Sequence, residues 1–238
     1  MIDSAPLKWV WMDLDDTLID FRRNSRVALG RLYTAENLCV WYPTADEWIE
    51  SYEKVNKPLW KRYSAGEITV GRLRLDRFLI PLLEGGMEED EALTRARRYD
   101  TYYLDLLAEE KAVLPGAHEV LRELREMGYG IGILSNGFSE VQHRKIASAG
   151  LDGLVDTVVL SDDIGVTKPD IRLYEYAMRR VGSARSSEHL MVGDNLDTDI
   201  QGAINAGWQA VYFSPSRPQD SPTVVSDLRE LPTLLRRR

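Results

Sequence analysis

Residues 9–20 read WVWMDLDDTLID, a short apolar run followed at once by a group of acidic side chains. The apolar half has the bulk and the hydrophobicity of a buried strand. The acidic half carries four carboxylates, those of Asp13, Asp15, Asp16 and Asp20. Carboxylates that crowd together at the end of a strand repel one another, so the pattern predicts a site whose charge a cation offsets.

The composition is that of an ordinary globular protein, with 238 residues, 44% hydrophobic and 29% charged. This length allows one large domain, or a core with a smaller inserted domain. The formal net charge of −8 disfavours non-specific binding to nucleic acid and to anionic membranes. Cys39 is the single cysteine, so a disulfide within this chain is excluded. No apolar run has the length of a signal or membrane-spanning segment, so we expect a cytoplasmic location and no membrane partner.

Only helical periodicity is found between residues 21 and 112. Apolar residues recur three or four positions apart in the segments 26–38, 45–63, 69–83 and 89–110. Breaks at Pro43, around Gly66 and at Gly85 and Gly86 separate these segments. This region is therefore predicted to be a bundle of four or more helices.

Helices and strands alternate from residue 113 onward. Apolar runs predict strands at 129–135, 155–161, 189–194 and 209–214. Helical periodicity predicts helices at 115–128, 139–150, 168–182 and 197–207, and a short helix near the end of the chain. Pro169 is expected in the first turn of its helix. This order is typical of a parallel sheet with helices on both faces.

The first strand then belongs to the same sheet, and the helical region interrupts the chain after it. We therefore predict a three-layer, Rossmann-like α/β core of residues 1–18 and 113–238, with a helical-bundle cap of residues 19–112. The aromatic residues of the cap have helical spacing, so we expect a cap core rather than a base-stacking pocket from Trp41, Tyr42, Trp48, Tyr52 and Trp60.

Each expected strand is followed by side chains of distinctive chemistry. In an open parallel sheet the carboxyl ends of the strands meet at one edge, where ligands bind. The residues expected at that edge are Asp13, Asp15 and Thr17, then Ser135 and Asn136, then Lys168, and finally Asp194, Asp197 and Asp199. Acids, a hydroxyl, an amide and a lysine are thus predicted to converge.

These residue types suit phosphoryl transfer. A carboxylate can attack phosphorus to form an aspartyl-phosphate, and a second carboxyl can protonate the leaving oxygen and later activate water. Mg²⁺ takes oxygen ligands and offsets the grouped acids. Lysine, serine and backbone N–H groups can hold the phosphate.

Four segments, DLDDT, LSNG, KPD and GDNLDTD, resemble in order the four motifs of the haloacid dehalogenase superfamily. The resemblance implies that Asp13 is the nucleophile and Asp15 the general acid and base. It implies that Mg²⁺ is the cofactor and that its ligands are the Asp13 carboxylate, the Asp15 backbone carbonyl and Asp194. The inserted helices resemble the C1 cap of this superfamily, which is expected to close over the site.

The same resemblance implies roles for the other residues at this edge. Ser135 and Lys168 bind phosphate, with Asn136 supporting them from its loop. Asp199 is expected to steady Lys168 or a metal-bound water, although direct metal contact by Asp197 or Asp199 stays open. Asp197 is favoured as the N-cap of its helix.

Thr17 is expected to form a hydrogen bond within the turn or to help position the site. Asp16 and Asp20 are expected to shape the turn and the connection into the cap. Both are therefore predicted to be structural rather than catalytic.

Asp15 favours phosphate esters as substrates, because the dehalogenases of the superfamily have no aspartate two residues after the nucleophile. The segments LSNGFSEVQHRKIASAGL, LSDDIGVTKPD and MVGDNLDTDIQGAINAGW are most similar to the pyrimidine 5′-nucleotidase group, with N-acylneuraminate-9-phosphatase nearby. We therefore predict a Mg²⁺-dependent phosphomonoester hydrolase that acts on a small phosphorylated metabolite. The narrower prediction is a pyrimidine-preferring nucleoside 5′-monophosphatase. A sugar-phosphate phosphatase, a phosphomutase and a catalytically silent binding module are the alternatives.

Overall fold

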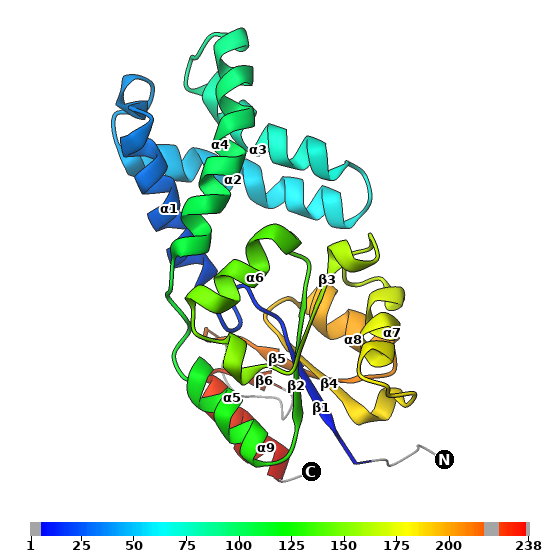
Figure 1. Ribbon diagram of the computed structural model, residues 1–238. Helices are drawn as coiled ribbons and strands as arrows, with labels where there is room; N and C mark the ends of the chain where they lie inside the picture. Colours follow the sequence, from blue (N-terminus) through cyan, green and yellow to red (C-terminus); the bar gives the residue numbers. More distant parts are fainter. Residues whose placement is uncertain (1–5, 217–223, 237–238) are drawn as a thin grey trace. The chain divides into compact units, whose positions relative to one another are not determined.

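The computed structural model describes residues 6–216 and 224–236, and the chain divides into two compact units (Figure 1). One unit comprises residues 1–21 and 111–238, and the other comprises residues 22–110. The sequence placed these boundaries after residues 18 and 112. They differ because the backbone pairs residues on either side of the insertion. The amide of Asp20 donates to the carbonyl of Ala112 at 3.1 Å, and the amide of Leu114 donates to the carbonyl of Leu18 at 2.9 Å.

A six-stranded sheet forms the centre of the first unit, with the strand order β3-β2-β1-β4-β5-β6. All neighbouring strands are parallel. The strands are β1 (Trp9–Met12), β2 (Gly130–Ser135), β3 (Thr157–Leu160), β4 (His189–Gly193), β5 (Gln209–Phe213) and β6 (Val224–Val225). The chain crosses from one side of β1 to the other between β3 and β4. The carboxyl ends of β1 and β4 therefore form the switch point where open α/β sheets bind ligands.

Side chains of β1 alternate between the two faces of the sheet, as the pleat requires. Val10 and Met12 belong to one hydrophobic core and Trp11 to another. The first core includes residues of α5 (Ala117–Glu126), α6 (Ser139–Ser148) and α9 (Leu231–Arg236), and the second includes residues of α7 (Ile171–Arg180) and α8 (Gly202–Asn205). Helices thus cover both faces, which confirms the predicted three-layer α/β core.

The helix predicted at 168–182 begins later than expected. The Lys168–Pro169 peptide bond is cis, and α7 begins at Ile171 with Asp170 as its N-cap. Pro169 therefore lies before the helix, and its predicted place in the first turn is wrong. The cause is Asn136, whose side chain binds both the N–H and the carbonyl of Lys168, at 2.7 and 3.0 Å, and keeps that residue in the loop.

The helix predicted at 197–207 is formed in two parts. A π-helix, η5 (Leu196–Gln201), precedes α8. Asn195 is its N-cap and accepts hydrogen bonds from the amides of Asp197 and Thr198 at 3.0 and 3.1 Å. The prediction that Asp197 is the cap is therefore wrong, and its side chain is exposed.

Four helices form the inserted unit, as predicted. They are α1 (Phe21–Ala35), α2 (Ala45–Ser64), α3 (Val70–Glu84) and α4 (Glu89–Glu109). The threonines before α2 and α3 cap them, because Thr44 accepts from the amide of Glu47 and Thr69 from the amide of Arg72, both at 3.2 Å. Short 3-10 helices complete the two units: η1 (Leu38–Val40), η2 (Asp152–Leu154), η3 (Ser161–Asp163), η4 (Ser186–Glu188) and η6 (Leu228–Glu230).

Aromatic side chains fill the core of the inserted unit. Tyr42, Trp48 and Tyr52 are buried there, as expected, and the Trp48 ring stacks on Phe78 with centroids 6.4 Å apart. Trp41 and Trp60 are only half-buried, so the expectation is wrong for these two.

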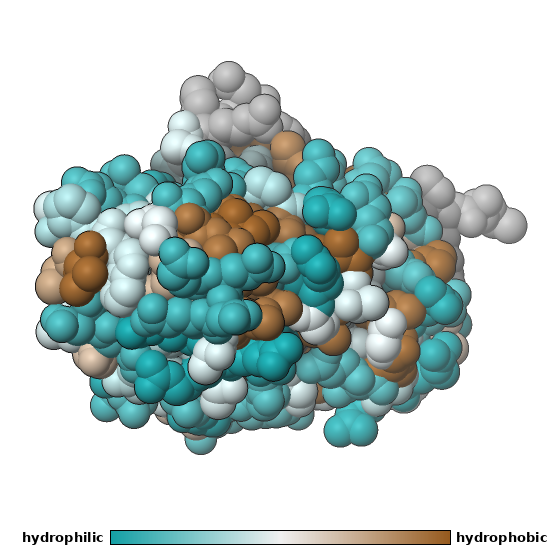
Figure 2. All heavy atoms as spheres, turned by 90° about the horizontal axis from the view of Figure 1, so that it is seen from above, coloured by the Kyte–Doolittle hydropathy of each residue, from teal (hydrophilic) through white to brown (hydrophobic). Residues whose placement is uncertain are grey.

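The surface drawn in Figure 2 is mostly hydrophilic, with hydrophobic residues in separate groups between charged and polar ones. Of the helices in the described residues, none combines the length and the hydrophobicity needed to cross a bilayer.

A substitution at Gly132 tests how closely β1 and β2 are packed. It pairs with Trp11 across β1 and β2, and a Cβ at this position would lie 2.3 Å from Cε3 of the fully buried Trp11 ring. We expect Gly132→Ala to lower the free energy of unfolding by about 1–3 kcal/mol, because the ring must shift within a close-packed core. Gly153→Ala is the control, since nothing lies within 4 Å of a Cβ there. Urea unfolding followed by circular dichroism measures both, and equal midpoints would contradict this account.

Candidate active site

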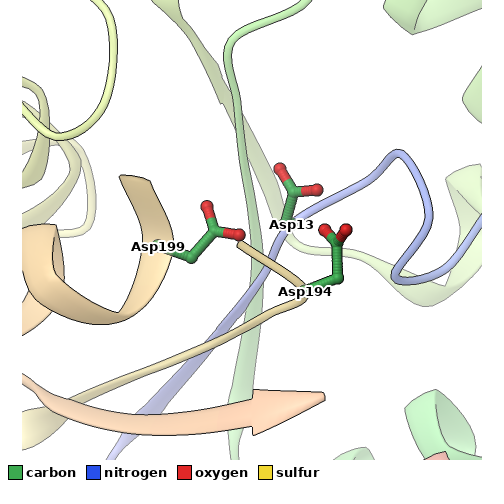
Figure 3. A group of neighbouring side chains, drawn as sticks. All are labelled: Asp13, Asp194 and Asp199. Carbon is green, nitrogen blue, oxygen red and sulfur yellow. The ribbon is translucent and has the colours of Figure 1, made fainter. Parts of the chain in front are cut away.

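Asp13 and Asp194 lie at the ends of the two strands that flank the switch point. Asp13 follows β1 directly, and its amide donates to the carbonyl of Val192 in β4 at 2.9 Å. Asp194 follows β4, and Asp199 reaches the same place from η5 (Figure 3). One carboxylate oxygen from each of the three residues lies within 4.8 Å of the others. The structure thus brings together acids that are 181 and five residues apart in the sequence.

The ammonium of Lys168 is buried among these carboxylates. Its Nζ donates to Oδ1 of Asp13 and to Oδ1 of Asp199, both at 2.6 Å, and to the carbonyl of Leu134 at 2.7 Å. These three contacts use all three donors of the ammonium and fix its position. Asn136, which the sequence grouped with the phosphate-binding residues, holds the Lys168 main chain through the two contacts described above.

Asp199 is oriented by contacts to both of its oxygens. Oδ1 accepts from Lys168, and Oδ2 accepts from the amide of Asn195 at 3.1 Å. The close fit needs a glycine at the end of β4, because a Cβ on Gly193 would lie 2.2 Å from Oδ2 of Asp199. Asp199 therefore lies against the lysine, one of the two places that the sequence proposed for it.

Burial and mutual repulsion make the carboxyl groups of Asp13 and Asp194 difficult to ionise. Burial raises the pKa of Asp13 well above its usual range; Lys168 opposes this shift, and Asp199 and Asp194 add to it. Burial, followed by the charges of Asp199 and Asp16, raises the pKa of Asp194 to about 6. Burial alone would lower the pKa of Lys168, but Asp13 and Asp199 raise it overall. Three carboxylates thus lie near one ammonium, which contacts two of them, Asp13 and Asp199.

The excess of negative charge and the all-oxygen donor set fit a magnesium ion. Asp13 and Asp194 would hold it with their carboxylates, together with the Asp15 backbone carbonyl that the sequence resemblance adds. Thr17 is fully buried, and its hydroxyl donates to Oδ1 of Asp194 at 3.3 Å. Such a bond orients a ligating carboxylate from behind.

The carboxylate of Asp15 points to α6. Lys145 forms a salt bridge with its Oδ1, and Nε2 of Gln142 donates to its Oδ2 at 3.0 Å. Gln142 also donates to the hydroxyl of Ser135 at 2.8 Å. Sequence reasoning missed both α6 residues. The sequence offered one indication of them. Gln142 and Lys145 are three residues apart, and so on one face, in the helix that directly follows the LSNG segment.

Asp16 forms part of the turn after β1, as the sequence predicted. It has a left-handed backbone, with φ of 58°, and its amide donates to the carbonyl of Ile19 at 2.8 Å. A short acidic side chain tolerates this conformation better than most residues do. The turn returns the chain toward the start of the insertion.

Comparison with known proteins agrees with this geometry. Residues 7–207 match the model of the haloacid dehalogenase-like hydrolase family. The chain belongs to this family. It is 34% identical over 232 residues to pyrimidine 5′-nucleotidase YjjG of Escherichia coli, covering 95% of this chain and 97% of that protein. It is 32% identical over 208 residues to pyrimidine 5′-nucleotidase PynA of Streptococcus pneumoniae, covering 87% and 84%.

A solved structure shares the fold over the whole chain. The HAD hydrolase YfnB of Bacillus subtilis, in a crystal form bound to magnesium, superposes with a TM-score of 0.86 at 25% identity. The match covers 98% of this chain and 100% of that one. The predicted superfamily and its α/β fold with inserted helices are thus confirmed.

The raised pKa of Asp194 predicts that Mg²⁺ binding depends on pH. A ligating carboxyl must lose its proton, and the pKa values of both Asp194 and Asp13 are raised. Below about pH 6 binding therefore releases protons, and the affinity falls by at least about tenfold per pH unit. The part of this dependence that comes from Asp194 ends above about pH 7, where that carboxyl is already ionised. Isothermal titration calorimetry in two buffers of different ionisation enthalpy measures both effects. Asp194→Asn is the control and should bind weakly and release fewer protons. Equal affinity at pH 5 and pH 7.5 would refute the assignment.

Proposed function

We propose that this hydrolase cleaves phosphomonoesters in a Mg²⁺-dependent reaction that passes through a phosphorylated Asp13. The observation that carries the proposal is the buried Asp13 carboxylate at the β1–β4 switch point, bonded to Lys168 at 2.6 Å. The lysine holds the nucleophile in place and offers positive charge next to the phosphate that it attacks.

In the first step, a carboxylate oxygen of Asp13 attacks phosphorus as the bond to the ester oxygen breaks. Asp15 gives its proton to the departing alcohol. In the second step, Asp15 takes a proton from water, whose oxygen attacks phosphorus and frees the Asp13 carboxylate and inorganic phosphate. Ser135 donates its hydroxyl hydrogen to a phosphoryl oxygen, and Lys168 offers its positive charge from its place against Asp13. Bound Mg²⁺ supplies the positive charge that lets acids and a phosphate share one site.

Nucleoside 5′-monophosphates, with pyrimidines preferred, are the proposed substrates. The support is the similarity over nearly the full chain to two proteins named as pyrimidine 5′-nucleotidases, at 34% and 32% identity. Sugar phosphates are the alternative, because the core residues contact only the phosphate and the reacting oxygen. A phosphomutase would transfer the phosphoryl group to a sugar rather than to water, and a silent binding module would release no phosphate.

Replacing the nucleophile tests the mechanism. Asp13→Asn keeps the size of the side chain but removes the attacking charge, so we expect at least a 10³-fold loss of kcat with p-nitrophenyl phosphate. The amide oxygen of Asn can still accept from Lys168, which also keeps its ion pair with Asp199, so we expect the variant to fold. Colorimetric phosphate release and circular dichroism measure these quantities. Substantial turnover by the variant would exclude Asp13 as the nucleophile.

A phosphate-release screen tests the substrate class. The purified protein is incubated with pyrimidine and purine 5′-monophosphates, sugar phosphates and an aryl phosphate, with Mg²⁺ or with excess chelator. We expect the highest kcat/KM for pyrimidine 5′-monophosphates and no release after chelation. Equal rates for all esters would remove the nucleotidase assignment and keep the phosphatase. No release from any ester would favour the silent binding module.

A further inference from the structure

Two buried polar residues of α6 bind the carboxylate of Asp15. Gln142 and Lys145 are each only 2% exposed, and their spacing of three residues places them on one face of the helix. Lys145 binds Oδ1 of Asp15 through its ammonium, and Gln142 binds Oδ2 through its amide nitrogen. Each carboxylate oxygen therefore has its own donor, and the plane of the carboxylate is fixed.

The orientation of the Gln142 amide follows from its neighbours. Its Oε1 accepts from the ammonium of Lys145 at 2.8 Å, and an ammonium can only donate. The amide nitrogen must therefore face the other way, and its two hydrogens go to Asp15 at 3.0 Å and to Ser135 at 2.8 Å. Gln142 thus links the residue proposed to donate the proton with the one proposed to bind phosphate.

The same contacts determine what the Ser135 hydroxyl can do. Its oxygen accepts from Gln142 and from the amide of Gly137, the latter at 3.2 Å. Both lone pairs are then occupied, and the single hydroxyl hydrogen is left to donate. Gly137 also makes room for Gln142, because a Cβ there would lie 2.0 Å from Nε2. The missing side chain at Gly137, the glycine of the LSNG segment, thus leaves the space that the Gln142 side chain occupies.

A purely structural function explains this cluster less well. Burying an ammonium together with a carboxylate gains little net stability, because the desolvation cost offsets their attraction. An apolar pair would anchor α6 equally well. The cluster instead connects Asp15, the proposed proton donor, to Ser135, the proposed phosphate-binding residue. Lys145 is additionally held by Phe21, whose ring centroid lies 5.1 Å from Nζ.

We propose that Gln142 and Lys145 are positioning residues that fix the carboxyl of Asp15 relative to the phosphate held by Ser135. The proposal rests on the phosphatase function proposed above. When the phosphorus–oxygen bond breaks, the proton of Asp15 must move to the leaving oxygen along a short, aligned path. Without the two α6 side chains the carboxyl rotates freely, and proton transfer loses this alignment.

The test compares esters whose leaving groups differ in their need for a proton. Gln142→Leu and Lys145→Met remove the contacts with little change of volume, and Lys145→Arg keeps the charge. For a nucleoside monophosphate, whose alcohol leaves only with a proton, we expect kcat/KM to fall by about 10²-fold in the first two variants. For 2,4-dinitrophenyl phosphate, whose phenolate leaves unprotonated, we expect a loss of less than about fivefold. Lys145→Arg should recover most of the loss.

Controls separate this proposal from the function on which it rests. His143→Leu changes an exposed neighbour on the same helix and should leave both rates unchanged. Asp15→Asn should show the same dependence on the leaving group as Gln142→Leu. If kcat/KM falls equally for both esters in the α6 variants, or does not fall, the positioning role is wrong and the proposed phosphatase function is unaffected. No hydrolysis of either ester by the unaltered protein would overturn the phosphatase itself. If Lys145→Met does not fold, Gln142→Leu alone decides.

Discussion

The contact between Lys168 and the carboxylates of Asp13 and Asp199 is the interaction around which the core unit is arranged. Its three hydrogen bonds join the end of β1, the end of β2 and the π-helix after β4. Two neighbouring residues make this contact possible. Asn136 holds the lysine's backbone, and Gly193 leaves room for Asp199. Negative charge still exceeds positive charge at this point, which is why a divalent cation suits the site.

Much of this arrangement follows from the sequence. Apolar runs and helical periodicity predicted the sheet and its helices, because burial imposes these patterns on any chain. The convergence of Asp13, Lys168 and Asp194 was also predictable, since parallel strands end at the same edge. The order of the four segments then indicated the family.

The remaining features depend on tertiary contacts that periodicity does not record. Gln142 and Lys145 are polar residues on a short helix, and such residues usually face solvent, so only the structure shows that they are buried. Pro169 suits a first helical turn, but the Asn136 contacts hold its neighbour in the loop. Asp197 and Asn195 are both good caps, and nothing local distinguishes them.

The phosphoryl group on Asp13 is the most direct test of the account. The Mg²⁺-loaded protein is mixed with 2,4-dinitrophenyl phosphate, quenched in acid within milliseconds, digested and examined by mass spectrometry. We expect a mass increase of about 80 Da, that of a phosphoryl group, on the peptide that contains Asp13. Asp13→Asn should not gain this mass. Steady release of phosphate by an unaltered protein that carries the group on another residue, or on none, would contradict the account.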